Sequence, residues 1–349
     1  MQAINLRSDT QTLPTEAMLE AIATAPLGDD TFGEDPTVAR LESMAAKMLG
    51  KESAMLVISG TMGNLVSLMA QTNCGDEVIV DPHAHIFLRE VGGMASVAGL
   101  MPMPVPSHDG MLDPDEVAAA IRKPDLHCPT PKVLCLENTH NRSGGRVVRL
   151  EVHRRLCAVA HERGLKVHLD GARIFNAQVA AGIPALQWAK DADSVMFCLS
   201  KGLSCPLGSV VAGDAEFIEK ARHCRKRVGG GMRQAGIIAA CGIVALGTMI
   251  DRLAEDHANA KLLAHGLNEI PGFRVDLEKV ETNMVYVDHS ATGLWTDEVL
   301  ARLKSAGVLA SGSPPGRIRF VLHRHYDAAA VEEVLRRIAS AIPAPMGLV

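Results

Sequence analysis

Aromatic residues are scarce in this sequence, and it has no excess of positive charge. Phe, Trp and Tyr together make up 3% of the 349 residues, and the formal net charge is -5 at pH 7. Proteins that bind nucleic acid typically carry a basic surface, often with aromatic side chains that stack on bases. We therefore expect no nucleic-acid partner.

Long apolar runs are absent as well. No stretch approaches the ~20 consecutive apolar residues that a membrane span requires. Residues 1–13 include Arg7 and Asp9 and lack the apolar core of a secretory signal. We expect a chain without membrane contact that remains in the cytoplasm.

Cysteine motifs that would indicate disulfides or zinc are also missing. None of the eight cysteines belongs to a Cys-x-x-Cys pair, and none has zinc-finger spacing to histidines. Several lie in apolar runs, which indicates small buried thiols in a reducing compartment and no metal site. The eight are Cys74, Cys128, Cys135, Cys157, Cys198, Cys205, Cys224 and Cys241.

Short apolar strands alternate with helices through the first 250 residues. Asp35 and Gly50 have the residue types that begin and end a helix over 35–50. Continuous apolar strands of this kind are typical of a parallel sheet covered on both faces. The pattern predicts an α/β domain over residues 1–250, with a mainly parallel sheet between helices. Its strands are expected at 54–58, 77–80, 132–136, 165–169 and 194–199, and its other helices at 62–71 and 150–163.

The pattern of predicted strands and helices changes near residue 250. An amphipathic helix is expected over 251–267, and Thr296 and Asp327 are expected to cap two later helices. Strands are expected at 273–275, 283–287 and 317–322. Residues 251–349 therefore read as a smaller C-terminal α+β domain.

Three polar features follow strands of the predicted sheet, where ligands bind in parallel α/β folds. The first is Ser59-Gly60-Thr61-Met62-Gly63-Asn64, a strand-to-helix turn whose backbone N–H groups could hold a phosphate. It lacks the Gly-x-Gly-x-x-Gly fingerprint of dinucleotide sites, which disfavours a nicotinamide dehydrogenase. The alternative for this segment is a purely structural turn.

The other two features are Asp170 and Lys201. Asp170 closes an apolar strand, and its carboxylate would favour a protonated pyridine nitrogen. Lys201 follows a buried strand, where desolvation makes an amine a better nucleophile toward an aldehyde. The alternatives are a helix cap for Asp170 and, for Lys201, a lysine that bridges carboxylates or a helix end. The turn, Asp170 and Lys201 correspond to the phosphate, the pyridinium nitrogen and the aldehyde carbon of pyridoxal phosphate, which we predict as the cofactor.

In its motifs and their order, the sequence resembles the low-specificity L-threonine aldolases, which have the aspartate-aminotransferase fold. The resemblance covers nearly the whole chain. The motifs that carry it lie at 6–10, 28–38, 59–64, 136–141, 168–176, 198–203, 229–234 and 282–285.

For the cofactor, the resemblance implies a role at each of several positions. Lys201 would form the Schiff base, and Asp170 would hold the pyridinium nitrogen. Gly60 and Thr61 would bind the phosphate, and Arg233 would reach it from a neighbouring subunit. The resemblance thus implies a homotetramer with shared active sites.

For the substrate, an amino acid, the resemblance implies a second set of residue roles. His85 would stack on the cofactor ring, and His127 would lie near the substrate hydroxyl. Ser8, Arg173 and Arg319 would bind the substrate carboxylate, with Arg173 also near the cofactor. A pair of arginines on one carboxylate would fix which Cα bond is broken.

Alternatives stay open for three of these positions. Arg319 could be a surface arginine of its strand, and His127 a loop histidine. His85 could be a core histidine, with His83 as the rival for the stacking position.

The chain departs from the family at two places. The family often has tyrosine at Phe32, and smaller residues than Ser204-Cys205 are expected after the lysine motif. These departures bear on substrate preference, not on the cofactor.

The resemblance implies retro-aldol cleavage of L-threonine or L-allo-threonine to glycine and acetaldehyde. The base that takes the β-hydroxyl proton would be His85, His127 or a water held by one of them. The rivals are another pyridoxal-phosphate reaction on this scaffold, such as transamination or β-elimination, and a non-catalytic cofactor-binding protein. The second rival would be expected to have lost Lys201 or the carboxylate-binding arginines.

Overall fold

The computed structural model describes residues 3–313 and 316–342, which form two compact units. The larger unit comprises residues 13–143 and 147–250. The smaller unit contains the described part of 251–349 together with residues 3–12 and 144–146. Residues 3–12 were expected in the large domain, and the structure corrects this. The short strand β1 (Ile4–Asn5) pairs in parallel with β12 (Val308–Leu309), so the N-terminal segment belongs to the smaller unit.

The larger unit is built on a seven-stranded sheet with the order β2-β10-β9-β8-β7-β3-β4. Only β10 runs antiparallel to its two neighbours in this sheet, so the other six strands are parallel to one another. This is the mainly parallel sheet that the apolar runs predicted. The strands are β2 (Ser53–Val57), β3 (Glu77–Val80), β4 (Met101–Pro104), β7 (Pro131–Glu137), β8 (Lys166–Asp170), β9 (Ser194–Cys198) and β10 (Ser209–Gly213).

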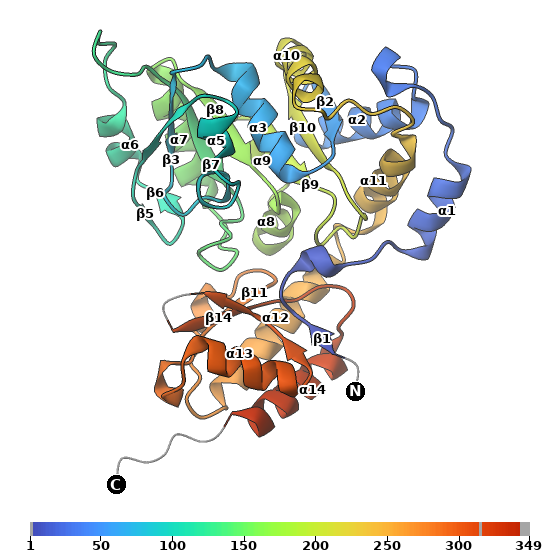
Figure 1. Cartoon of the computed structure of the whole chain (residues 1–349), viewed down its shortest axis with the longest axis vertical. Coiled ribbons are helices and arrows are strands. Elements are labelled where there is room, and N and C mark those ends of the chain that lie inside the picture. The colour runs from blue at the N-terminus through green and yellow to red at the C-terminus, as the bar shows by residue number, and fades with distance from the viewer. Residues whose placement is uncertain (1–2, 314–315, 343–349) are drawn as a thin grey trace. The chain divides into compact units, whose positions relative to one another are not determined.

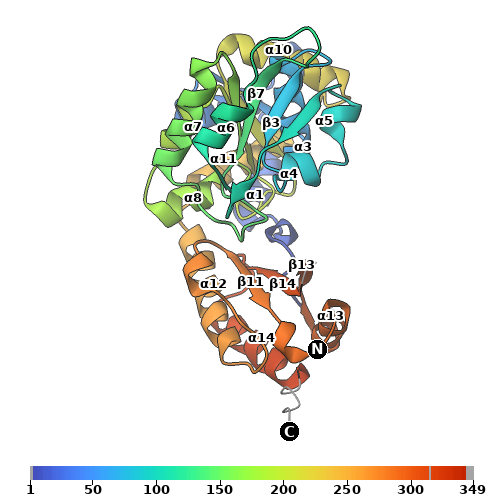
Figure 2. The ribbon, with the colours of Figure 1, turned by 90° about the vertical axis from the view of Figure 1, so that its left-hand side faces the viewer.

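Helices cover both faces of this sheet, and α3 and α7 lie on opposite sides of β3 and β7 (Figure 1, Figure 2). Residues of β2, β9, β10, α3 and α10 form one buried apolar cluster on one face. The longer helices are α1 (Glu16–Thr24), α2 (Pro36–Leu49), α3 (Gly60–Gln71), α6 (Pro114–Ala120), α7 (Leu150–Glu162), α8 (Ile174–Ala181), α10 (Ala215–Arg227) and α11 (Gly236–Thr248). The short ones are α4 (His85–Leu88), α5 (Gly93–Ser96) and α9 (Leu186–Ala189).

Capping residues bound α2 as the sequence predicted. The Asp35 carboxylate accepts hydrogen bonds from the backbone N–H groups of Thr37 and Val38, both at 3.0 Å. Gly50 ends the helix in the left-handed conformation, with φ of 62°. A side chain is unfavourable in this conformation, which is why glycine is common at this position.

The smaller unit contains the antiparallel sheet β11-β14-β13, formed by β11 (Met284–Asp288), β14 (Arg317–Val321) and β13 (Ser311–Ser313). Its helices are α12 (Leu253–Asn268), α13 (Thr296–Ser305) and α14 (Ala328–Ala341), which share one apolar core with the sheet.

Two details of the smaller unit differ from the prediction. The strand expected at 273–275 is only an isolated bridge between Arg274 and Asp288. Thr296 is the first residue of α13, and the capping position is Trp295. The predicted cap of α14 is confirmed, because Asp327 accepts a hydrogen bond from the Ala330 N–H at 2.9 Å.

All eight cysteines are free thiols. Six are buried as expected, whereas Cys74 and Cys128 are exposed. Among residues 3–313 and 316–342, no single helix combines the length and apolar composition of a membrane span, and α11 and α12 meet that criterion only when they are counted together.

Candidate active site

Polar residues gather at one edge of the large sheet. Because β2, β3, β7, β8 and β9 are parallel, their carboxyl ends meet at the same edge. Asp170 and Glu137 are paired in register at the ends of β8 and β7. Lys201 follows β9, and His85 begins α4 shortly after β3. The predicted cofactor residues of this unit therefore come from neighbouring strands.

Asp170 is almost completely buried, with 2% of its surface exposed. Its Oδ1 accepts a hydrogen bond from the Ala172 N–H at 3.0 Å, and its Oδ2 accepts one from Asn64 Nδ2 at 2.9 Å. The first bond is the local contact that would be expected if Asp170 were only a helix cap. The second comes from α3, 106 residues away in the chain, and aims the carboxylate independently of that turn.

Asn64 is the centre of a buried hydrogen-bond network. Its Nδ2 donates to Asp170 and also to Glu90 Oε1, at 2.9 Å. Since both neighbours of this nitrogen are carboxylate oxygens, the amide Oδ1 must face the other way, toward His168 Nε2 at 3.0 Å. His168 Nε2 therefore carries a proton and donates it.

His168 is the second member of this network, and it is neutral. Burial lowers the pKa of His168 to about 4, so its Nδ1 acts as an acceptor. Ser194 Oγ donates to that Nδ1 at 2.8 Å, and Gln71 Nε2 donates to Ser194 Oγ at 2.8 Å. The directions of all these bonds are mutually consistent, which holds Asn64, and through it Asp170, in one orientation.

His85 lies next to this network. Its Nδ1 is 2.9 Å from Glu90 Oε1, and its backbone N–H donates to Glu137 Oε2 at 2.6 Å. The hydrogen bond to Glu90 raises the pKa of His85, and burial raises the pKa of Glu90. The charges of Asp170 and Lys201 also act on the His85 ring. His83, the rival in the sequence, is exposed.

The turn before α3 approaches β9 very closely. A Cβ atom added at Gly60 would lie 2.8 Å from Cys198 Sγ, so only glycine fits without a rearrangement. The Ser59 hydroxyl accepts the Met62 N–H at 3.2 Å. The first N–H groups of a helix have no partner within it, so those of Gly60 and Thr61 are suited to an anion.

Arg173 is buried in the turn between β8 and α8, three residues after Asp170. Gly171 precedes it at a position where a Cβ atom would lie 2.9 Å from the Met196 carbonyl oxygen. The turn is therefore held tightly against β9. This places Arg173 at the same sheet edge as Asp170, as predicted.

Ser8 and Arg319 belong to the smaller unit, where the structure brings them together. The Arg319 guanidinium donates from Nη2 to the Arg7 carbonyl oxygen at 3.1 Å, and Ser8 is the next residue. The Ser8 hydroxyl accepts the Thr10 N–H at 3.2 Å and caps a 3-10 turn. Their binding of a substrate carboxylate stays a prediction.

His127 does not join the network around His85. It is exposed in the loop between α6 and β7, and its backbone N–H donates to Asp125 Oδ1 at 2.8 Å. The structure thus matches the loop alternative at this position, whereas His85 contacts the buried network through Glu90.

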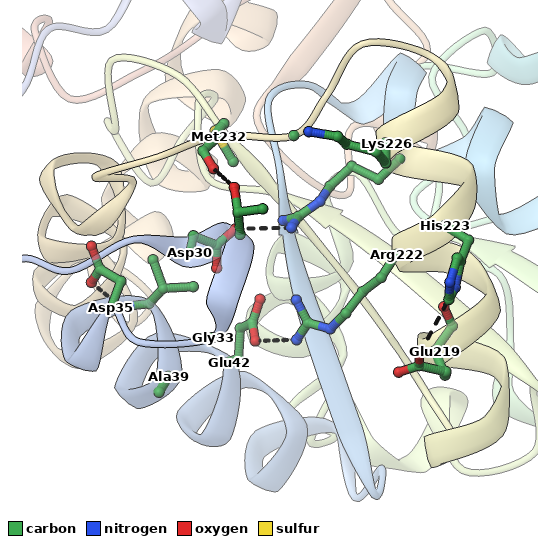
Figure 3. Close-up of a pocket in the computed structure, with 14 residues that line it drawn as sticks. Asp30, Gly33, Asp35, Ala39, Glu42, Glu219, Arg222, His223, Lys226 and Met232 are labelled. Atoms are coloured by element: carbon green, nitrogen blue, oxygen red, sulfur yellow. Dashed lines mark hydrogen bonds and ion pairs between the residues drawn. The ribbon is translucent and has the colours of Figure 1, made fainter.

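Arg233 belongs to the 229–234 motif, and Met232 beside it lines a pocket together with Asp30 of the 28–38 motif (Figure 3). Arg233 Nη1 donates to Thr31 Oγ1 at 2.7 Å, and 59% of the Arg233 side chain is exposed. Asp30 forms a buried ion pair with Arg225 at 2.8 Å. A cavity of about 540 Å³ lies here, lined mainly by α2 and α10 and by none of the predicted cofactor or substrate residues.

Several residues around this site were missed from the sequence, among them His168, Ser194 and Gln71. Asn64 and Glu137 stand in quoted motifs but were given no role, and Glu90 follows α4 without any local signal. His85, Glu90 and Asp170 have ligand atoms within 4.8 Å of one another, a spacing that also suits a metal ion. However, both carboxylates accept N–H donors of Asn64, so hydrogen bonding accounts for the cluster.

Comparison with known proteins agrees with this arrangement. The model of the family described as beta-eliminating lyase matches residues 5–290. The chain belongs to this family. Its members are pyridoxal-phosphate enzymes, so the predicted cofactor is confirmed.

The chain is also similar to low-specificity L-threonine aldolases over nearly its whole length, which confirms the predicted family. Low-specificity L-threonine aldolase 1 of Arabidopsis thaliana is 44% identical over 96% of this chain and 95% of its own length. The low specificity L-threonine aldolase of Escherichia coli K12 is 42% identical over 95% of this chain and 97% of its own.

A solved threonine aldolase from Leishmania major has a TM-score of 0.83 and 18% identity, and the match covers 97% of this chain and 99% of that one. This likeness confirms the predicted α/β fold.

The residues of this chain fit pyridoxal phosphate. The turn at Gly60 is a cradle that a Cβ atom would fill, and it opens on the N-terminus of α3. Asp170 offers a buried carboxylate, and Lys201 offers a half-buried amine at the same sheet edge. An anion site, a carboxylate and an amine correspond to the phosphate, the pyridine nitrogen and the aldehyde of this cofactor.

Proposed function

We propose that this chain is a threonine aldolase that cleaves L-threonine, L-allo-threonine and related β-hydroxy-α-amino acids to glycine and an aldehyde. The observation that carries the proposal is the placement of Asp170, Lys201 and His85 at one sheet edge of a chain 44% identical to a low-specificity L-threonine aldolase. When bound, pyridoxal phosphate would supply the electron sink for breaking the Cα–Cβ bond.

The protein's own groups would each do one task. Lys201 would hold the cofactor as a Schiff base, and Asp170 would keep its pyridine nitrogen protonated. The N–H groups of Gly60 and Thr61 would bind its phosphate. Arg173 is suited to the substrate carboxylate, because a guanidinium donates two parallel hydrogen bonds.

His85 is the better candidate for the base. Its ring is half-buried and held by Glu90, whereas His127 is exposed in a loop. A base must lie within hydrogen-bond reach of the proton it removes, and a ring held at Nδ1 is presented in a defined orientation. His85 would take the β-hydroxyl proton at Nε2, directly or through a water.

The assay follows both products with the reconstituted enzyme. We expect acetaldehyde and glycine from L-threonine and L-allo-threonine, without a keto acid. Lys201→Ala should abolish turnover and the visible absorbance of bound cofactor, whereas Lys220→Ala, at an exposed lysine of α10, should leave both intact. Keto acid or ammonia in place of acetaldehyde would favour the transaminase or β-eliminating rival instead.

We further propose a homotetramer in which Arg233 reaches a neighbouring active site. In support, Arg233 is exposed, and the adjacent Phe32 has 74% of its surface exposed. Light scattering would measure the assembly. Mixing inactive Lys201→Ala subunits with weakened Arg233→Ala subunits should restore part of the activity, because some sites then receive both intact residues. No restoration after subunit exchange would contradict shared sites.

A further inference from the structure

Glu90 is a buried carboxylate to which the proposed reaction assigns no task. It lies two residues after α4, with 7% of its surface exposed. A single oxygen, Oε1, is 2.9 Å from His85 Nδ1 and 2.9 Å from Asn64 Nδ2. Burying a carboxylate is costly unless it is hydrogen-bonded, and both partners here belong to the candidate site.

The network determines the donor on the Asn64 side of Glu90. Asn64 must present its N–H groups to Glu90 and Asp170, because its carbonyl oxygen accepts from His168. Glu90 Oε1 is therefore an acceptor on the Asn64 side. An ionised carboxylate accepts on the other side as well, which requires the proton of the neutral His85 ring to be on Nδ1. The Nε2 atom then carries a free lone pair.

Four charged groups act on His85. Glu90 contacts its Nδ1, and the Glu137 carboxylate accepts its backbone N–H. Asp170 and Lys201 act through their charges, with opposite signs. Glu90 is hydrogen-bonded to the ring itself, whereas Glu137 contacts the backbone, so Glu90 is the group that can select between the two tautomers.

We propose that Glu90 is a positioning residue that keeps the proton of His85 on Nδ1 and so makes Nε2 the atom that accepts the substrate's β-hydroxyl proton. This inference rests on the proposed function. As the proton moves from the hydroxyl oxygen to Nε2, Glu90 stabilises the imidazolium that forms, until the proton is given back. The same arrangement orients the histidine in serine-protease triads, where a buried carboxylate holds one ring nitrogen.

The first measurement needs neither cofactor nor activity. Nitrogen NMR of the histidine-labelled apo protein, with the His85 signals assigned by His85→Gln, reports which ring nitrogen carries the proton. We expect the Nδ1–H form in the parent, and a shift toward the Nε2–H form with a lower His85 pKa in Glu90→Ala. Glu90→Asp should recover part of the parent signal. An unchanged tautomer in Glu90→Ala would overturn the inference.

The second measurement uses the reconstituted enzyme. Glu90→Gln should lower kcat for L-threonine by about 10- to 100-fold, with KM within about threefold, and should move the limb of the pH profile that belongs to His85. Glu162→Gln, at an exposed glutamate of α7, is the matched control and should change nothing. A lower kcat with an unmoved pH limb and a lower Tm would mean that Glu90 acts only on stability, and would overturn the inference.

The two proposals fail differently. A parent enzyme that releases no aldehyde would overturn the proposed function, whatever the tautomer of His85. An active parent whose His85 tautomer and pH limb do not respond to Glu90 would leave the aldolase intact and overturn the role of Glu90.

Discussion

Gly63 of α3 offers a direct test of how closely this helix must approach the sheet. A Cβ atom added there would lie 2.6 Å from Met196 Cγ and 3.2 Å from Val211 Cγ2. These atoms belong to the buried cluster between α3 and the sheet, and Met196 Cγ is not the free end of its side chain. Overpacking a core costs about 1–3 kcal/mol, against a gain of about 1 kcal/mol in helix propensity.

Gly63→Ala should therefore destabilise the protein by up to about 2 kcal/mol, which lowers Tm by up to about 8 °C in a unit of this size. The same displacement would move the turn at Gly60, so we also expect weaker binding of pyridoxal phosphate in a fluorescence titration. The matched control is Gly247→Ala in α11, where a Cβ atom would meet nothing within 4 Å. That variant should be stabilised by about 0.5 kcal/mol. Equal Tm changes in the two variants would refute the packing argument.

Three further predictions concern buried groups. Burial lowers the pKa of His168 to about 4, so between pH 4 and 6.5 this histidine binds more protons in the unfolded chain than in the folded one. The free energy of unfolding therefore falls as the pH is lowered through this range, by up to about 3 kcal/mol from this residue. His168→Gln should reduce that slope when urea midpoints at pH 5 and pH 7.5 are compared. Arg173→Lys should raise KM for threonine at least tenfold without loss of cofactor absorbance, because a lysine cannot donate two parallel bonds; an unchanged KM would exclude Arg173 as the carboxylate ligand. Asp30→Asn should cost about 3–5 kcal/mol in urea unfolding, since it leaves the buried Arg225 unpaired, and a smaller loss would mean that water reaches this pair.

Local patterns were sufficient for much of the fold. The cap at Asp35 and the stop at Gly50 were predictable because each satisfies backbone groups within a few residues. The apolar runs at 194–199 and 165–169 predicted buried strands, and Asp170 and Lys201 stand out as polar residues that follow them. The bridge at Arg274 and the strand β1 were not predictable in this way, because they depend on partners far along the chain.

By itself, the sequence determined the alternation of strands and helices, the family, and the strand-end residues suited to pyridoxal phosphate, since all of these are read over short windows or from ordered motifs. Only the tertiary structure decided that Asn64 joins Asp170, Glu90 and His168, across separations of 106, 26 and 104 residues. Such a network has no local period. Its members meet only because parallel strands end at one sheet edge and a close-packed α3 reaches across them, so the orientation of His85 is a property of the folded chain.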